Sequence, residues 1–359
     1  MFVQYFFLSL ALSIIATLCV RIIMRRFGVV DKPEVQKRKI HKKVVPLGGG
    51  FGIFFSFFLV VLILVFQGNI GEGVSHHYLL GLFLGSLVIM VGGVIDDKYN
   101  LRARYQIWFP IVAAVLIIAF GIGPHVITNP LGGDFFLGYW KINFFGIGNW
   151  VILADVVVFF WLMGMMFTTK FLDGLDGLVA GVVAIGAFMI YFLSLQAQWY
   201  QPDVALLAIV FAGSCLGFLI WNWHPAKIFL GEGGSLFTGF VLGTLAIISG
   251  GKIATTLLVV GVPMLDVIRV VIRRIQKKKP VYEGDTEHLH FKLLNSGLSQ
   301  KQAVLLFYTI SLLFGITALF LQSSQKLIAL LFLFILMLLM GIWFMHKEDG
   351  LWRKKTNVQ

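Results

Sequence analysis

The chain has 359 residues, of which 58% are hydrophobic and only 13% are charged. Soluble domains are about 45–50% apolar and about 25% charged, so this composition excludes an ordinary soluble protein and indicates a polytopic membrane protein within the lipid bilayer. The net charge of +12 requires no nucleic acid as a partner, because most of the basic residues lie where loops on one side of a membrane are expected. The two cysteines lie within apolar segments, so no disulfide framework is implied.

Apolar segments long enough to cross a bilayer, about 17–25 residues each, recur along the whole chain. We expect an all-α membrane protein with eleven transmembrane helices, forming a single domain over residues 1–359. The first segment is expected to be a permanent span rather than a signal peptide, because arginines follow it and no basic segment precedes it. The predicted spans are about 3–24, 47–67, 77–95, 105–123, 149–169, 177–196, 203–221, 235–250, 253–275, 301–321 and 325–346.

The distribution of basic residues predicts the orientation of these spans. If the first helix runs from outside to inside, only Lys141, Lys252 and Lys326 among the 29 Lys and Arg residues lie on the outer side. We therefore expect the N-terminus outside and the C-terminus in the cytoplasm. The outer segment near 124–148 has aromatic and β-branched residues between glycine-rich turns, which is typical of a small β-hairpin.

Acidic residues gather in short motifs at the ends of predicted spans, all on the cytoplasmic side. Asp96 and Asp97 end the third span. Asp173 and Asp176 follow the fifth span in the motif Asp-Gly-Leu-Asp-Gly-Leu, and Glu232 lies just before the eighth. Carboxylates at membrane depth are costly and usually functional, so this clustering suggests chemistry on a metal-bound phosphate. The alternatives are an interfacial cap for the Asp-Asp pair and a helix N-cap for the second motif, although capping explains only one of its carboxylates.

The segment around Glu232 is rich in glycine and leads directly into the eighth span. A helix N-terminus offers unpaired N–H groups and a positive dipole end to a phosphate, so Gly233 and Ser235 are candidate substrate-binding residues. Glu232 is a candidate Mg²⁺ ligand, because Mg²⁺ binds through one or two carboxylates together with substrate phosphates. An ordinary loop at the start of a helix is the alternative interpretation.

Basic side chains in two other cytoplasmic loops are candidate phosphate contacts. His288 and His290 follow a basic run, and they point the same way if their segment is extended. His41 and Lys42 precede the second span, where basic residues are expected in any case. Asp266 lies inside the ninth span, and we interpret it as a structural hydrogen-bonding partner rather than a wall of the site.

In this order, the motifs resemble those of the polyprenyl-phosphate N-acetylhexosamine-1-phosphate transferases, the glycosyltransferase family 4 enzymes that include the translocase making peptidoglycan lipid I. The resemblance covers roughly residues 20–300, and it includes the His…Pro-x-Gly-Gly entry to the second span and a histidine motif before Leu-Leu. It implies transfer of a sugar-1-phosphate from a UDP-sugar to undecaprenyl phosphate, with release of UMP. It also implies a Mg²⁺ cofactor, for which Mn²⁺ would substitute.

The resemblance further implies the first membrane step of cell-envelope glycan synthesis, such as O-antigen or teichoic acid assembly, at the cytoplasmic face of the bacterial inner membrane. The histidine loop is more similar to the branch that uses UDP-N-acetylglucosamine than to the lipid I branch. Asp96 would deprotonate or orient the lipid phosphate. The implied catalytic residues are Asp96, Asp97, Asp173 and Asp176, the metal ligands Asp97, Glu232 and Asp173, and the substrate-binding residues His41, Lys42, Lys170, Gly233, Ser235, His288 and His290.

Three positions depart from the family pattern. Lys170 stands where family members usually have Asn, Glu232 where they have Asp, and Phe291 where a further His is common. We hypothesise that the first two changes compensate each other, because the cation of Lys170 would pair with Glu232 or with a substrate phosphate. A relative with altered or lost activity is the main alternative.

Two other classes fit the sequence less well. A secondary transporter would place charges near the membrane midplane and show internal repeats, whereas the acids here lie at the cytoplasmic ends of spans. The CDP-alcohol phosphotransferases need Ala-Arg after Asp-Gly, and Leu175-Asp176 follows here. Homodimers are common among membrane enzymes of this kind, although no residue in this chain argues for one.

Overall fold

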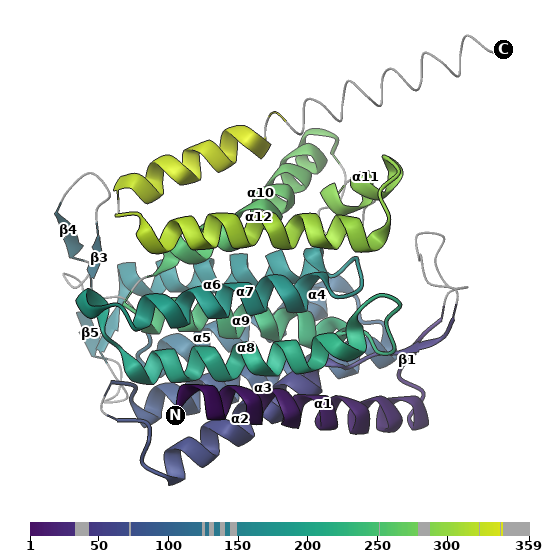
Figure 1. The fold of residues 1–359 in the computed structure, drawn as a ribbon, viewed down its shortest axis with the longest axis horizontal. Coiled ribbons are helices and arrows are strands. Elements are labelled where there is room, and N and C mark those ends of the chain that lie inside the picture. Colours follow the sequence, from purple (N-terminus) through teal and green to yellow (C-terminus); the bar gives the residue numbers. More distant parts are fainter. Residues whose placement is uncertain are drawn as a thin grey trace.

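The structure is a computed structural model that describes residues 1–32, 43–71, 73–123, 126–128, 133–136, 141–143, 149–250, 252–278, 288–322, 324–337 and 339. Within these residues, seven helices are long and apolar enough to cross a membrane, and four shorter apolar helices accompany them. Together they coincide with the predicted spans to within a few residues, apart from the predicted end of the last span near 346, which lies outside the described residues. The all-α polytopic fold is confirmed. Figure 1 shows most of them running side by side as one bundle.

The helices that match the predicted spans are α1 (Phe2–Arg26), α2 (Gly50–Phe66), α3 (His76–Tyr99), α4 and α5 (Ala103–Gln106 and Trp108–Ala119), α6 (Ile152–Leu172), α7 (Leu178–Ser194), α8 (Pro202–Asn222), α9 (Gly231–Ile248), α10 (Ile253–Gln276), α12 (Gln300–Phe320) and the final helix Ser324–Met337. A 3₁₀ turn (Ala197–Trp199) precedes α8, and the short α11 (Leu289–Asn295) precedes α12. The strands form three antiparallel pairs: β1 (Val30–Asp31) with β2 (Val45–Pro46), β3 (Val126–Thr128) with β4 (Asp134–Phe136), and β5 (Lys141–Asn143) with β6 (Asn149–Val151).

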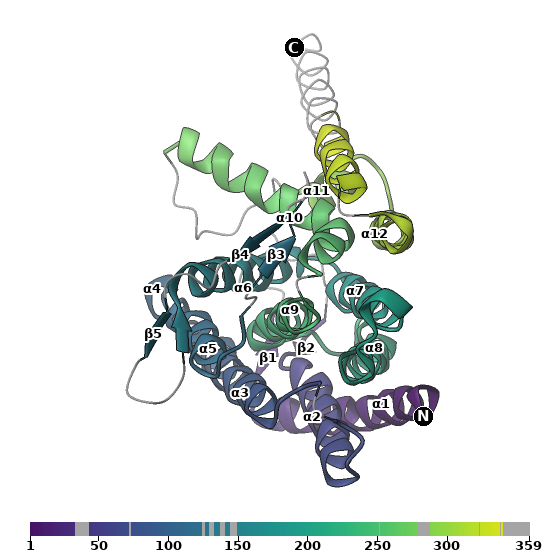
Figure 2. The same cartoon turned by 90° about the vertical axis from the view of Figure 1, so that its left-hand side faces the viewer.

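Helix α9 lies at the centre of the bundle, surrounded by its neighbours in the end-on view of Figure 2. It packs against α3 and α6, and also against α2, α7 and α10. Of its most apolar 18-residue segment, 89% is buried inside the protein, which is the highest share among the candidate spans in the described part of the chain. Because apolar side chains gain little by leaving lipid, small residues that allow close packing are what brings membrane helices together.

Two glycine pairs show this close packing at the N-terminal end of α9. A Cβ on Gly93 of α3 would overlap the backbone of Gly233, and a Cβ on Gly50 of α2 would overlap the backbone of Gly234. The glycine-rich segment before the eighth span is therefore mostly the first turn of α9. Gly233 and Gly234 pack against neighbouring helices, and contact of Gly233 with a substrate phosphate stays a prediction.

The outer hairpin is more elaborate than predicted. Two antiparallel strand pairs, β3 with β4 and β5 with β6, occupy the region where one hairpin was expected. Strand β6 leads directly into α6, and α6 is 21 residues long, or about 32 Å at 1.5 Å per residue. The strands thus lie at the opposite end of the bundle from Asp173, which follows α6.

Candidate active site

Asp97 joins the end of α3 to the start of α9. Its Oδ1 accepts a hydrogen bond from the backbone N–H of Glu232 at 3.1 Å. The first N–H groups of a helix have no partner within the helix, so this carboxylate satisfies one of them. Because Gly93 and Gly233 let the two backbones approach, the sequence places a carboxylate of one helix beside a carboxylate of the other.

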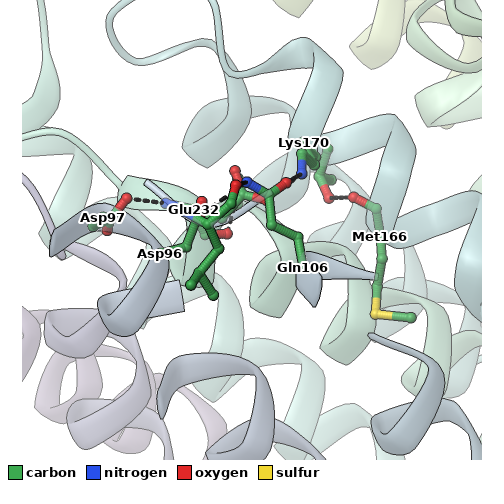
Figure 3. Close-up of polar contacts among 9 residues, drawn as sticks. Asp96, Asp97, Gln106, Met166, Lys170 and Glu232 are labelled. Atoms are coloured by element: carbon green, nitrogen blue, oxygen red, sulfur yellow. Dashed lines mark hydrogen bonds and ion pairs between the residues drawn. The ribbon is translucent and has the colours of Figure 1, made fainter. Parts of the chain in front are cut away.

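Asp96 begins a chain of polar contacts that crosses the site (Figure 3). Its Oδ1 accepts hydrogen bonds from the backbone N–H of Leu101 at 2.8 Å and from Nε2 of Gln106 at 2.9 Å. The Oε1 of Gln106 in turn accepts from Nζ of Lys170 at 3.2 Å. The sequence did not single out Gln106, since a neutral side chain at the edge of a predicted span carries no distinctive signal.

Lys170 completes this chain by forming an ion pair with Glu232. The two side chains are only 20% and 19% exposed, so their charges are largely shielded from water. The pairing that the sequence analysis hypothesised is thus present in the structure. Lys170, which departs from the family pattern, thus places a cation within the acidic cluster.

Asp173 ends α6 and is the exposed carboxylate of the cluster. The surrounding protein, the charge of Glu232 and the charge of Asp176 together raise the pKa of its carboxyl above the usual range. Glu232 and Asp176 thus contribute electrostatic repulsion at Asp173. A bound cation would relieve that repulsion.

Asp176 connects two loops instead of facing the other acids directly. Its Oδ2 lies 2.7 Å from Nδ1 of His224 and accepts from the backbone N–H of Ala226 at 3.1 Å. Asn222 ties the same loops, because its Oδ1 accepts from Gly177 N–H and its amide donates to the carbonyl of Ile228, both at 2.9 Å. The sequence analysis missed His224 and Asn222, although both lie in a polar stretch between two spans.

The two predicted histidines form a parallel stack beside the Asp-Gly motif. The rings of His288 and His290 have centroids 5.6 Å apart and planes 6° apart, and Phe171 stacks on His288 at 5.7 Å. The segment is not extended as expected, because α11 begins at Leu289. The histidines nevertheless share one face, since His290 lies in the first turn of that helix.

Asp266 holds this stack in place. Its Oδ2 lies 3.0 Å from Nδ1 of His288 and accepts from the backbone N–H of Leu289 at 3.0 Å. Its Oδ1 accepts from Arg269 at 2.7 Å. The interpretation of Asp266 as a structural hydrogen-bonding partner therefore agrees with the structure, and what it positions is a predicted site residue.

The Nε2 atom of His290 is buried, and it has no hydrogen-bond partner within the described part of the chain. It lies against Gly174, where a Cβ would overlap the imidazole ring. Buried polar atoms in native proteins are normally hydrogen-bonded. An unpartnered nitrogen at the Asp-Gly motif therefore fits a site that receives a polar ligand.

Acidification should destabilise the protein through His290. Burial and then the charge of His288 lower the pKa of His290 to about 3, whereas an unfolded histidine has a pKa of about 6.5. The unfolded state then binds more protons between these values, so the free energy of unfolding falls as the pH decreases through this window. We expect His290→Gln to lose less thermal stability than the wild type between about pH 7.5 and about pH 5.

Thermal unfolding in one detergent, without added metal, measures this difference. His76→Gln is the matched control, because it removes an exposed imidazole at the start of α3 and leaves His290 and its neighbours in place. Equal losses in the wild type and His290→Gln would contradict the prediction.

The remaining predicted residues contribute in other ways or lie elsewhere. Ser235 is buried, and its hydroxyl donates to the carbonyl of Glu232 at 2.9 Å within α9. His41 and Lys42 lie outside the described residues. Among the residues that the structure describes, no three His, Cys, Asp or Glu side chains are grouped so as to hold a metal ion. Metal binding by Asp97, Glu232 and Asp173 thus stays a prediction.

Comparison with known proteins decides the family of this chain. The model of "Glycosyl transferase family 4" matches residues 79–250. The probable undecaprenyl-phosphate N-acetylglucosaminyl 1-phosphate transferase of Bacillus subtilis is 33% identical over 344 residues, which are 94% of this chain and 89% of that protein. The chain belongs to glycosyl transferase family 4.

Two other relatives carry different names. The decaprenyl-phosphate N-acetylglucosaminephosphotransferase of Mycolicibacterium smegmatis is 30% identical, covering 82% of this chain and 75% of its own length. A phospho-N-acetylmuramoyl-pentapeptide-transferase of Halalkalibacterium halodurans is also 30% identical, covering 83% of this chain and 89% of its own length. The family 4 match includes the segments that carry Asp96, Asp97, Lys170, Asp173 and Glu232.

Proposed function

We propose that this family 4 protein transfers N-acetylglucosamine-1-phosphate from UDP-N-acetylglucosamine to undecaprenyl phosphate at the cytoplasmic face of a bacterial inner membrane. The observation that carries the proposal is the polar chain Asp96–Gln106–Lys170–Glu232, which meets Asp97 and Asp173 at one end of the bundle. A phosphate on a lipid tail and a soluble nucleotide meet at such an end. The similarity to the Bacillus subtilis transferase supports the choice of substrates.

In the proposed reaction, an oxygen of the lipid phosphate attacks the phosphorus that bears the sugar. The bond between that phosphorus and the bridging oxygen breaks, and UMP leaves with this oxygen. Such transfers depend mainly on positioning and charge stabilisation. Lys170 would stabilise negative charge on the transferring phosphate, and His290 would donate to a phosphate oxygen from Nε2. Asp96, whose Oδ1 is fixed by Leu101 and Gln106, would take or orient the proton of the lipid phosphate through Oδ2.

The donor set fits Mg²⁺ or Mn²⁺, because carboxylate oxygens are hard ligands and the mutual repulsion of the acids favours a cation. Asp97 and Asp173 would hold it, with Glu232 shared between the cation and Lys170. The bound ion would neutralise phosphate charge. A homodimer is compatible with this proposal, which requires only one chain for the site.

The proposal is tested by UMP release from purified protein in detergent with undecaprenyl phosphate and Mg²⁺. UDP-N-acetylglucosamine, UDP-N-acetylgalactosamine and UDP-N-acetylmuramoyl-pentapeptide are offered separately, with EDTA and Asp96→Asn as controls. Release with the first sugar alone, abolished by both controls, is the expected result.

The Lys170–Glu232 ion pair also favours a second candidate, a catalytically silent relative that binds the same substrates. Binding of UDP-sugars without UMP release would support that candidate. Release with only another sugar would overturn the choice of N-acetylglucosamine but not the reaction.

Asp266→Asn should weaken nucleotide binding more than it slows turnover. The asparagine keeps one acceptor oxygen, but it cannot serve His288, Leu289 and Arg269 together, so the histidine stack loses its anchor. We expect the KM for the UDP-sugar to rise about 10-fold, in line with the loss of one charge-assisted contact, with a smaller change in kcat.

Steady-state kinetics at varied UDP-sugar concentration measures the effect of Asp266→Asn. Asp266→Glu is the conservative replacement. Its KM should rise less than that of Asp266→Asn, because glutamate retains the charge. A fall in kcat alone, with KM unchanged, would count against a positioning role.

A further inference from the structure

Two lysines meet at the end of the bundle opposite the carboxylates. Lys252 immediately precedes α10, and Lys326 lies in the first turn of the helix Ser324–Met337. Both side chains are half-buried. Burial and then the charge of Lys326 lower the pKa of Lys252 to about 8, so the two ammonium groups act on each other.

The hydrogen-bond partners of these ammonium groups in the described part of the chain are neutral oxygens. Nζ of Lys252 donates to Ser194 Oγ at 2.8 Å and to Gln201 Oε1 at 3.3 Å. Nζ of Lys326 donates to Thr255 Oγ1 at 3.0 Å. An ammonium group has three donors, so both lysines retain donors for a further acceptor.

The acid nearest in sequence to Gln201, which accepts from Lys252, is engaged elsewhere. Asp203, in the first turn of α8, accepts hydrogen bonds through Oδ2 from the backbone N–H groups of Gly71 and Gly73 at 3.0 and 3.1 Å. It therefore ties α8 to the loop after α2. In the described part of the chain, the hydrogen bonds of both ammonium groups therefore include no carboxylate.

The positions of the lysines in their helices increase this positive potential. Lys252 and Lys326 lie at helix N-termini, where the helix dipole is positive and a cation is unfavourable. The local electrostatic potential is therefore positive, because two like charges lie at two positive helix ends in neutral surroundings. A bound anion would lower this potential.

Exposed aromatic side chains near the lysines indicate the level of the lipid headgroups. Trp199 and Tyr200 are exposed beside Gln201, and Phe320 is exposed at the end of α12. Exposed Trp and Tyr side chains concentrate at membrane–water interfaces. An anion available at this depth, in an apolar setting, is the phosphate of a lipid.

We propose that Lys252 and Lys326 together bind the phosphate group of a membrane lipid, at the membrane surface opposite the active site. The lipid phosphate would accept the free donors of both ammonium groups and face two helix N-termini, while its acyl or prenyl chain packs on the exposed apolar surface of α12. This site would hold either an anionic phospholipid or a polyprenyl phosphate, and it does not depend on the proposed transferase activity.

The test uses the full-length protein in nanodiscs of phosphatidylcholine, with native mass spectrometry of the lipids retained after mild detergent release. Phosphatidylglycerol, undecaprenyl phosphate and inorganic phosphate are added in separate titrations. The variant Lys252→Gln/Lys326→Gln is compared with the wild type, and Lys141→Gln, in strand β5, is the control for loss of an outer charge.

We expect the double variant to show an apparent affinity about 10-fold lower for a phosphate lipid, with Lys141→Gln unchanged. A loss confined to phosphatidylglycerol assigns the site to phospholipid headgroups, and a loss confined to undecaprenyl phosphate assigns it to the prenyl lipid. Equal retention by all three proteins, or a difference seen only with inorganic phosphate, would overturn the proposal. Unchanged thermal unfolding of the double variant verifies that it is folded.

Discussion

Lys170→Asn should reduce UMP release about 100-fold. The substitution leaves Glu232 without its ammonium partner beside Asp97 and Asp173, and removing one member of a largely buried ion pair costs far more than the pair contributes. Losses of this size are typical when a charge-stabilising group is removed from an active site. Glu232→Asp should reduce activity about 10-fold, because the shorter side chain withdraws from Lys170 by one methylene.

The combination Lys170→Asn/Glu232→Asp distinguishes compensation from two independent losses. We expect its activity to exceed the product of the two single effects, because the shorter acid and the amide recreate the pairing usual in the family. Lys98→Asn removes a neighbouring exposed cation near the end of α3 and serves as the control. Strictly multiplicative losses would remove the support for compensation between the two positions.

Gly93→Ala should destabilise the protein by about 3 kcal/mol, at the upper end of overpacking effects. The added methyl group would overlap the backbone of Gly233, so α9 has to move away from α3. That movement separates Asp97 from the Glu232 N–H, and activity should fall together with stability. Thermal unfolding in detergent and UMP release measure the two effects.

Gly92→Ala is a matched control for this prediction. It adds the same methyl group to the adjacent residue, where the group would overlap the Phe109 ring at Cγ, so a side chain has to change its rotamer rather than a second helix its backbone. We expect a clearly smaller loss of stability for Gly92→Ala. Similar unfolding temperatures for the two variants would mean that the helix–helix contact is less tight than the structure shows.

The span pattern could be predicted from the sequence because the length and apolarity of a membrane helix are local properties. The acidic motifs could be found in the same way, since a carboxylate at membrane depth is rare and therefore conspicuous. The contact between Lys170 and Glu232 was reached as a hypothesis, because two unusual residues of opposite charge suggested a pair.

Other parts of the site depend on packing that no local pattern encodes. Gln106 and His224 become site residues only because folding brings α4 to α6 and the loop after α8 to the Asp-Gly motif. The packing of Gly233 on another helix could not be predicted from the sequence, since a glycine-rich turn and a helix packing surface have the same composition. Which of the two it forms depends on whether another glycine, here Gly93, faces it.

The different depths of the charged groups have a consequence for which molecules can enter the site. Asp173 is exposed, whereas Lys170 and Glu232 are about four-fifths covered. Among these three groups, an approaching molecule encounters the carboxylate of Asp173 first and the Lys170–Glu232 ion pair only farther in. A bare polyanion would be turned away before it reached the lysine, while a phosphate that arrives with its charge already reduced would pass. We expect this outermost carboxylate to favour a substrate whose phosphate charge is already reduced by a bound cation.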